Sequence, residues 1–234
     1  MTAAPAPSEL TASGLAYLFP EKFPAPAALG TSVVAPESTV VAETPAINLI
    51  VIALWSLRES GFIELHPFTE KHLKLFTSHG VRAVVKQTPE TAGIEGRLLH
   101  ALGREKHDGA DVKWAVQEIV PAAKDPYAAA VTAVEDEVAT AGYLTKVHRR
   151  PGLMAIFDGE PKWTYQPIPE LYPPLAGRAD ALAKAWNSFL ADPTYPAVCD
   201  VVREAIASRT VKDVDPYELQ RQQQQFLQQQ QQQF

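Results

Sequence analysis

Cysteine is almost absent from the sequence, which contains one, Cys199, in 234 residues. A single thiol excludes a disulfide within the chain and is typical of proteins from reducing compartments. The six histidines have spacings that match no short zinc-binding pattern. We therefore expect no disulfide, no metal and no cofactor, and a cytoplasmic location.

A long hydrophobic run is also missing. The most apolar stretch, at 46–57, spans about twelve residues, whereas a helix that crosses a membrane needs roughly 20. It contains Asn48 and is followed by Arg58 and Glu59, so it predicts a buried core helix. The N-terminus has neither the basic nor the apolar region of a signal peptide. We expect no transmembrane segment, although the protein could attach peripherally to a membrane.

Motifs of catalysis are missing as well, since the chain has no nucleophile elbow, no P-loop and no dinucleotide-binding fingerprint. Residues 93–96 form only a glycine-flanked loop, with no lysine-threonine pair to hold a nucleotide. Cys199 lies in an apolar helical pattern, where a buried and inert thiol is usual. The acidic run Glu135, Asp136 and Glu137 fans around its helix and predicts a solvent-facing surface. We expect a protein that is not an enzyme.

Proline is abundant instead, with 20 residues that punctuate the chain. Residues 1–44, rich in alanine and proline, predict an N-terminal arm with a short helix at 10–19 and short strands at 33–34 and 40–41. Residues 45–212 predict a helical domain with winged-helix-like features. Residues 213–234 are mainly glutamine and predict a disordered tail.

The hydrophobic periodicity and the capping residues predict the regular elements of the chain. Helices are expected at 45–60, 96–102, 111–120, 127–141, 176–190 and 196–208, and strands at 62–65, 72–76, 81–86, 143–149, 153–158 and 162–166. Two of these helices end at a glycine, Gly61 or Gly142, and are followed by strands. The expected fold class is mainly α with short β-hairpins (α+β), a helical bundle with winged-helix-like elements.

A basic hairpin at 143–166 is the strongest local signal for binding. The candidate residues for an anionic ligand are Lys146, His148, Arg149, Arg150 and Lys162. On an alternating strand Lys146, His148 and Arg150 share one face. That face could contact nucleic-acid phosphates, as the wing of a winged helix does, or anionic lipid heads. A hairpin edge that is merely protected by charge is the alternative.

Three stretches together resemble the Golgi phosphoprotein 3 family. They are LIVIALWSLRESGFIEL at 49–65, VVKQTPETAGIEGRLLHAL at 84–102, and AVEDEVATAGYLTKV at 133–147. The resemblance implies a mainly α-helical adaptor, and the eukaryotic members bind phosphatidylinositol 4-phosphate at membranes. The family's lipid pocket uses arginines before the first core helix and at the start of the helix preceding the hairpin. This sequence has TPA at 44–46 and DPY at 125–127 there, so the lipid site is not expected to carry over.

Two functions follow from these patterns. The first is a non-enzymatic adaptor or scaffold of the Golgi phosphoprotein 3 type, which binds a partner protein or an anionic membrane surface. The alternative is a winged-helix DNA-binding regulator that uses the 143–166 hairpin. The helix before that hairpin is acidic, which makes it a poor element to enter the major groove of DNA.

Overall fold

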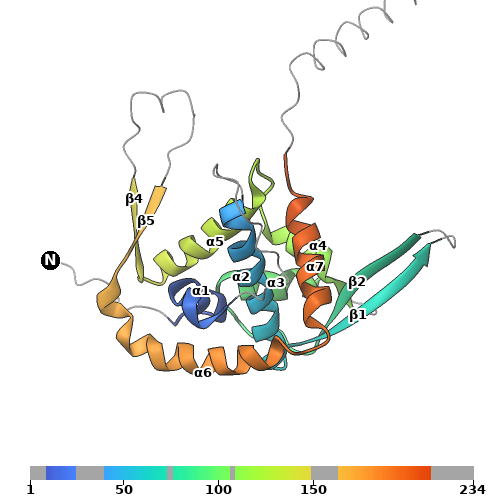
Figure 1. The fold of residues 1–234 in the computed structure, drawn as a ribbon, viewed down its shortest axis with the longest axis horizontal. Helices are drawn as coiled ribbons and strands as arrows, with labels where there is room; N and C mark the ends of the chain where they lie inside the picture. The colour runs from blue at the N-terminus through green and yellow to red at the C-terminus, as the bar shows by residue number, and fades with distance from the viewer. Residues whose placement is uncertain (1–8, 25–39, 73–75, 106–108, 149–162, 212–234) are drawn as a thin grey trace, which may run out of the picture.

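The computed structural model describes residues 9–24, 40–72, 76–105, 109–148 and 163–211, with only the backbone described at 40–42, 71–72, 76–78 and 148. The helices are α1 (Ala12–Leu18), α2 (Val40–Glu59), α3 (Gly93–Gly103), α4 (Val112–Ile119), α5 (Pro126–Thr140), α6 (Pro173–Phe189) and α7 (Tyr195–Ala207), with short 3₁₀ turns η1 (Pro20–Lys22) and η4 (Pro169–Leu171). The strands are β1 (Ile63–His72), β2 (Phe76–Val85), β3 (Ala110–Asp111), β4 (Leu144–His148) and β5 (Trp163–Pro167). The fold is mainly α with short β-hairpins, as predicted, and α3 to α7 confirm five expected helices with slightly shifted ends (Figure 1).

Helix α2 forms the centre of the core. Every residue from 46 to 55 is buried, with Ile47, Ile50 and Leu54 fully enclosed. A helix that is apolar on all sides must be surrounded by other elements, and α1, α3, α5 and α7 all pack against α2. The prediction of a buried core helix is confirmed. No helix among the described residues is long and apolar enough to cross a membrane.

The start of α2 differs from the prediction. The helix begins at Val40 and contains Pro45, whereas the sequence predicted a strand at 40–41 and a helix that begins at Pro45. Proline lacks the N–H that would bond the carbonyl four residues earlier, which makes it a frequent first helical residue. Here a full turn of helix precedes Pro45. The carbonyl four residues before Pro45 therefore lacks its helical hydrogen bond, and the helix continues without it.

Residues 9–24, which the sequence assigned to an N-terminal arm, contribute to the core. Helix α1 confirms the short helix predicted at 10–19, and it begins after Thr11, whose hydroxyl accepts a hydrogen bond from the Gly14 amide at 3.1 Å. The large buried side chains of this segment are Leu10, Leu15, Phe19 and Phe23. The strand predicted at 33–34 lies outside the described residues.

The first hairpin pairs β1 with β2 antiparallel along the whole of both strands, and β3 adds a short third strand. The sequence predicted separate strands at 72–76 and 81–86, and that division is wrong, because β2 runs without a break through Gly80. The ring of Phe68 covers this glycine, where a Cβ would lie 2.4 Å from the ring. Gly80 therefore makes room for an aromatic side chain and does not end the strand.

The second hairpin pairs β4 with β5, from Leu144 opposite Pro167 to His148 opposite Trp163. This pairing confirms the predicted strands at 143–149 and 162–166. The return strand predicted at 153–158 lies outside the described residues. The two hairpins project from opposite sides of the helical body (Figure 1).

Both hairpins join their helices through the same glycine-centred turn. Gly61 has φ 73° and Gly142 has φ 90°, in the left-handed region that favours glycine. After α2, the Gly61 amide bonds the carbonyl three residues earlier at 2.9 Å, and the next amide bonds the carbonyl five residues earlier at 2.9 Å. After α5 the same two bonds measure 3.0 and 3.1 Å. These are Schellman motifs, so the predicted glycine ends of both helices are confirmed.

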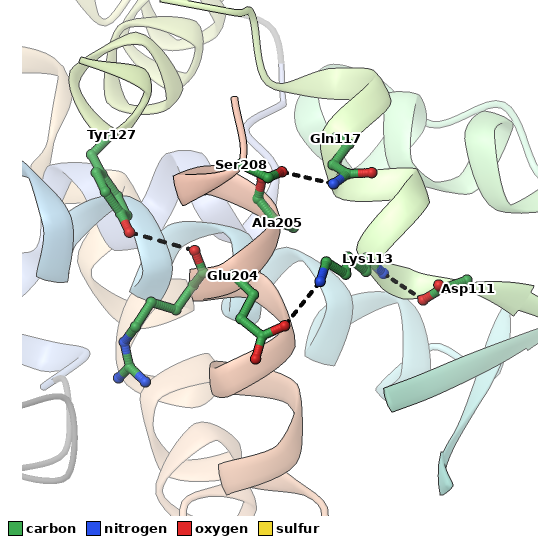
Figure 2. Close-up of polar contacts among 8 residues, drawn as sticks. Asp111, Lys113, Gln117, Tyr127, Glu204, Ala205 and Ser208 are labelled. Atoms are coloured by element: carbon green, nitrogen blue, oxygen red, sulfur yellow. Dashed lines mark hydrogen bonds and ion pairs between the residues drawn. The ribbon is translucent and has the colours of Figure 1, made fainter. Parts of the chain in front are cut away.

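Helix α7 closes the body against α4. Lys113 on α4 lies 2.9 Å from Glu204, and Gln117 donates a hydrogen bond to Ser208 at 2.7 Å (Figure 2). Asp111 caps α4 by accepting from the Lys113 amide at 2.9 Å, as its position in the sequence predicted. The glutamine-rich residues 213–234 lie outside the described part of the chain.

Candidate functional site

The structure describes part of the basic hairpin that the sequence singled out. Lys146 lies in β4, and the backbone of His148 ends that strand opposite Trp163. The His148 side chain and the residues Arg149, Arg150 and Lys162 lie outside the described part of the chain. Their shared face stays a prediction, and the described part of the site consists of Lys146 and its neighbours.

Lys146 is held by the helix that precedes its hairpin. Its Nζ lies 2.6 Å from Oδ1 of Asp136 on α5, and Tyr165 on β5 donates a hydrogen bond to the same oxygen at 2.5 Å. Contact with Asp136 raises the pKa of Lys146 above its usual value. Burial alone would raise the pKa of Asp136, but the hydrogen bonds from Lys146 and Tyr165 outweigh it and leave this pKa lowered. Asp136 thus ties both strands of the hairpin to α5.

Aromatic rings surround the Lys146 ammonium on the surface. Its Nζ lies 5.3 Å from the centre of the Trp163 ring and 5.5 Å from that of Tyr165. Trp163 is 46% exposed, although it is large and mainly apolar. A cation over aromatic faces is attracted to them, so the base of the hairpin presents a cation and an indole together.

The acidic run on α5 contradicts its predicted role as a solvent-facing surface. Tyr17 on α1 donates to Glu135 at 2.7 Å, and Asp136 holds the hairpin. Glu137 accepts hydrogen bonds from the Thr11 hydroxyl at 2.5 Å and from the first turn of α3 at 3.0 Å. The three carboxylates point in different directions around α5, as predicted, but each of them contacts another element of the fold. All three are half-buried anchors.

Glu95 on α3 is a buried carboxylate that the sequence did not reveal. It is 2% exposed, and its two oxygens accept from the amide and the hydroxyl of Ser13, each at 2.8 Å. Burial raises the pKa of Glu95 to about 7, and the negative charge of Glu137 adds to the effect. Residues 93–96 were predicted as a loop, which is wrong, because they form the first turn of α3.

Two glycines in that first turn allow the close packing. Gly93 has φ 66°, and a Cβ there would lie 2.1 Å from the Glu137 carboxylate. A Cβ on Gly96 would lie 1.9 Å from the carbonyl oxygen of Thr91. The glycine-flanked sequence therefore brings α3 against both α5 and the preceding loop. In the sequence, these two glycines predicted only a loop.

A cavity of about 700 Å³ opens beside these carboxylates. Its walls come from the chain before α1, the start of α3 and one side of α5, and they include Leu10, Arg97, Asp136 and Glu137. Since Asp136 also holds Lys146, the cavity adjoins the base of the second hairpin. Among the described residues, no group of three or more His, Cys, Asp or Glu side chains is placed to hold a metal ion.

Comparison of the chain with family models, curated proteins and solved structures finds no match. The resemblance to the Golgi phosphoprotein 3 family stays a prediction based on the three stretches of sequence. The fold itself defines a mainly α-helical protein with two projecting hairpins, of which the second carries a cation–aromatic cluster at its base.

Proposed function

We propose that this protein is a non-enzymatic adaptor or scaffold that attaches to an anionic membrane surface through the 143–166 hairpin. The observation that carries the proposal is the cluster of Lys146, Trp163 and Tyr165 at the exposed base of that hairpin. The cluster leads directly into the basic sequence at 148–150.

The residue types suit a membrane interface. Tryptophan and tyrosine favour the headgroup level, where one part of the side chain is apolar and another is wet. Each lysine or arginine near an anionic surface contributes about 1 kcal/mol. Lys146 is already matched by Asp136, so we expect most of the attraction to come from the basic residues Arg149, Arg150 and Lys162, on the order of 3 kcal/mol together.

The attachment of the hairpin to α5 gives the proposal its adaptor character. Because Asp136 fixes both Lys146 and Tyr165, a hairpin that lies on a membrane would set the orientation of the helical body. The remaining surface would then face a partner in a defined direction. This is what a scaffold requires of its membrane contact.

The packing of α5 disfavours the DNA-binding alternative. In a winged helix the recognition helix must expose a face to the major groove. Here α5 contacts α1, α2, α3, α7 and β4, and its three carboxylates are half-buried against neighbouring elements. An acidic helix with this many contacts is a poor reader of DNA.

The test is co-sedimentation of the full chain with vesicles at low ionic strength, beside a gel shift with random duplex DNA in the same buffer. We expect binding to vesicles that contain phosphatidylserine and none to pure phosphatidylcholine. Trp163→Ala and the double change Arg149→Glu with Arg150→Glu should each weaken it at least about tenfold. Lys184→Glu, an exposed cation on α6, is the matched control and should have little effect.

Two results would contradict the proposal. The first is sedimentation that none of these hairpin changes alters, which would make the hairpin a solvated surface only. The second is a DNA shift that the arginine changes abolish while vesicles are not bound, which would favour the winged-helix alternative.

A further inference from the structure

Arg97 on α3 stands apart from the other arginines of the described chain. Those with an ion pair or a hydrogen bond are Arg58, Arg82, Arg104, Arg178, Arg203 and Arg209. Arg97 is exposed and, among the described residues, makes neither kind of contact. A surface guanidinium without a partner is ordinary, so the surroundings of Arg97 decide whether it has a role.

Arg97 lies where two concave surfaces meet. One is the cavity of about 700 Å³ beside α5, and the other is a depression of about 420 Å³ between α3 and α4. His100 and Arg104 line the smaller depression with Arg97. Residues spaced by three and four along a helix lie on one face, so α3 presents three nitrogen-rich side chains to the same hollow.

Arg104 is held in place for such a role. Its guanidinium lies 3.1 Å from Glu118 on α4 and 5.6 Å from the centre of the Trp114 ring. Stacking on Trp114 and the ion pair with Glu118 fix the plane of the Arg104 guanidinium. The side chain therefore loses less conformational entropy when a ligand binds. Gly96 and Thr91 also line the depression. Because a Cβ on Gly96 would clash with the Thr91 carbonyl, no side chain projects into the depression at this position.

Arg97 makes no described hydrogen bond or ion pair, although its positive charge acts through space on Asp136 and helps to lower the pKa of that carboxyl. Glu118 is neutralised by Arg104 at 3.1 Å, and across the larger cavity Asp136 is neutralised by Lys146 at 2.6 Å. The chain as a whole carries a net charge of −6, so two arginines beside a single carboxylate, Glu118, make this depression a local exception. Guanidinium groups recognise carboxylate and phosphate oxygens through paired N–H donors.

We propose that the depression between α3 and α4 binds a small soluble dianion, a dicarboxylate or a phosphate compound, with Arg97 as its main contact and His100 and Arg104 beside it. The volume of about 420 Å³ falls in the range of small-molecule sites. None of these three residues lies in the 143–166 hairpin proposed for membrane attachment, although Arg97 also lines the larger cavity beside the base of that hairpin.

The test is calorimetric titration of the full chain with inorganic phosphate and, separately, with succinate. We expect saturable binding of at least one anion, and the two titrations tell which oxyanion the site prefers. Arg97→Gln should weaken binding roughly tenfold or more. It should change the unfolding temperature little, because the described residues make no hydrogen bond or ion pair with this exposed side chain.

Lys184→Gln removes one exposed positive charge on α6 and is the matched control. It should leave the affinity unchanged. Equal weakening by both substitutions would mean general electrostatic attraction and would overturn the site, as would the absence of saturable binding for both anions. Trp163→Ala should leave these titrations unchanged while reducing vesicle binding, so that failure of one proposal is distinguishable from failure of the other.

Discussion

The two helix–glycine–hairpin units share a joint but differ in what surrounds them. In both, a Schellman turn ends the helix. The carbonyl of the residue after the glycine then accepts a hydrogen bond from the returning chain, at 2.8 Å from the Lys86 amide to Phe62 and at 3.2 Å from the Ile168 amide to Tyr143. The first helix, α2, is buried on all sides from residue 46 to residue 55, whereas most residues of α5 are half-buried or exposed. The local sequence therefore determines the turn between helix and hairpin, whereas the contacts with other elements determine the role of each unit.

The hairpins differ in the same way. Two exposed ion pairs of the first hairpin, Glu64 on β1 with Lys86 just after β2 and Glu70 on β1 with Arg82 on β2, join its two sides to each other. The polar contacts of the second join both strands to its own helix through Asp136. We infer that the first hairpin is a projection stabilised from within, and that the second is an element with a fixed orientation.

The largest expected effect separates the two helices. Ile50→Ala removes a fully buried side chain from α2 and should lower the free energy of unfolding by about 2–5 kcal/mol. Thr132→Ala on the exposed side of α5 should change it by less than about 0.5 kcal/mol. Urea denaturation measures both. Similar values for the two substitutions would break the distinction between an enclosed helix and a half-exposed one.

The next effect concerns Glu95, which lies between the two units. Its pKa is raised by burial from 4.5 to about 7, so between these values the folded protein keeps a proton that the unfolded chain has lost. The free energy of unfolding therefore falls as pH rises through this range, on the order of 3 kcal/mol in total. Below pH 4.5 both states are protonated and the contribution of the carboxylic acid is fully retained.

Glu95→Gln should remove this part of the pH dependence. The amide can accept from the Ser13 N–H and donate to the Ser13 hydroxyl oxygen, which replaces both bonds of the carboxylate. Denaturation curves of the variant and the parent should agree near pH 4.5, and the variant should be the more stable above pH 7. If the free energies of unfolding of the variant and the parent differed by the same amount at every pH, the raised pKa of Glu95 would be contradicted.

A smaller effect tests the shared joint directly. Gly61→Ala and Gly142→Ala each place a Cβ on a backbone with φ near 73° or 90°. The left-handed conformation costs an ordinary residue about 1–2 kcal/mol. A Cβ on Gly61 would meet no atom within 4 Å, so conformation alone accounts for the loss there. Thermal denaturation should give losses of similar size, and a negligible loss at either glycine would end the claim of a common joint.

The elements that the sequence predicted well are those with local signals. Asp111 and Asp125 cap α4 and α5 through their own side chains, and Gly61 and Gly142 end α2 and α5. Each signal acts within one turn of helix, so neighbouring residues contain all the information required. The strands β4 and β5 were predicted for the same reason, since alternation of residues along a strand is local.

The features that the sequence did not reveal depend on partners far along the chain. Gly80 continues β2 because Phe68 covers it, and Glu95 is buried against Ser13, which lies 82 positions earlier. The acidic run has the same pattern whether its carboxylates face water or anchor other elements. Only the fold decides between these cases, so Asp136 could not be predicted as the residue that holds the hairpin.

The smallest expected effect tests that role of Asp136. Tyr165→Phe removes the hydroxyl that donates to its carboxylate at 2.5 Å and should lower the free energy of unfolding by about 0.5–1.5 kcal/mol. Hydrogen exchange should accelerate at the β4–β5 amides and stay unchanged in β1 and β2, because no described residue of the first hairpin has a tie of this kind to α5. Thr164→Ala on the same strand is the control, because the exposed Thr164 hydroxyl bonds the backbone carbonyl of Val147 within the hairpin. If both substitutions accelerate exchange equally, the second hairpin is stabilised from within like the first, and its fixed orientation has no basis.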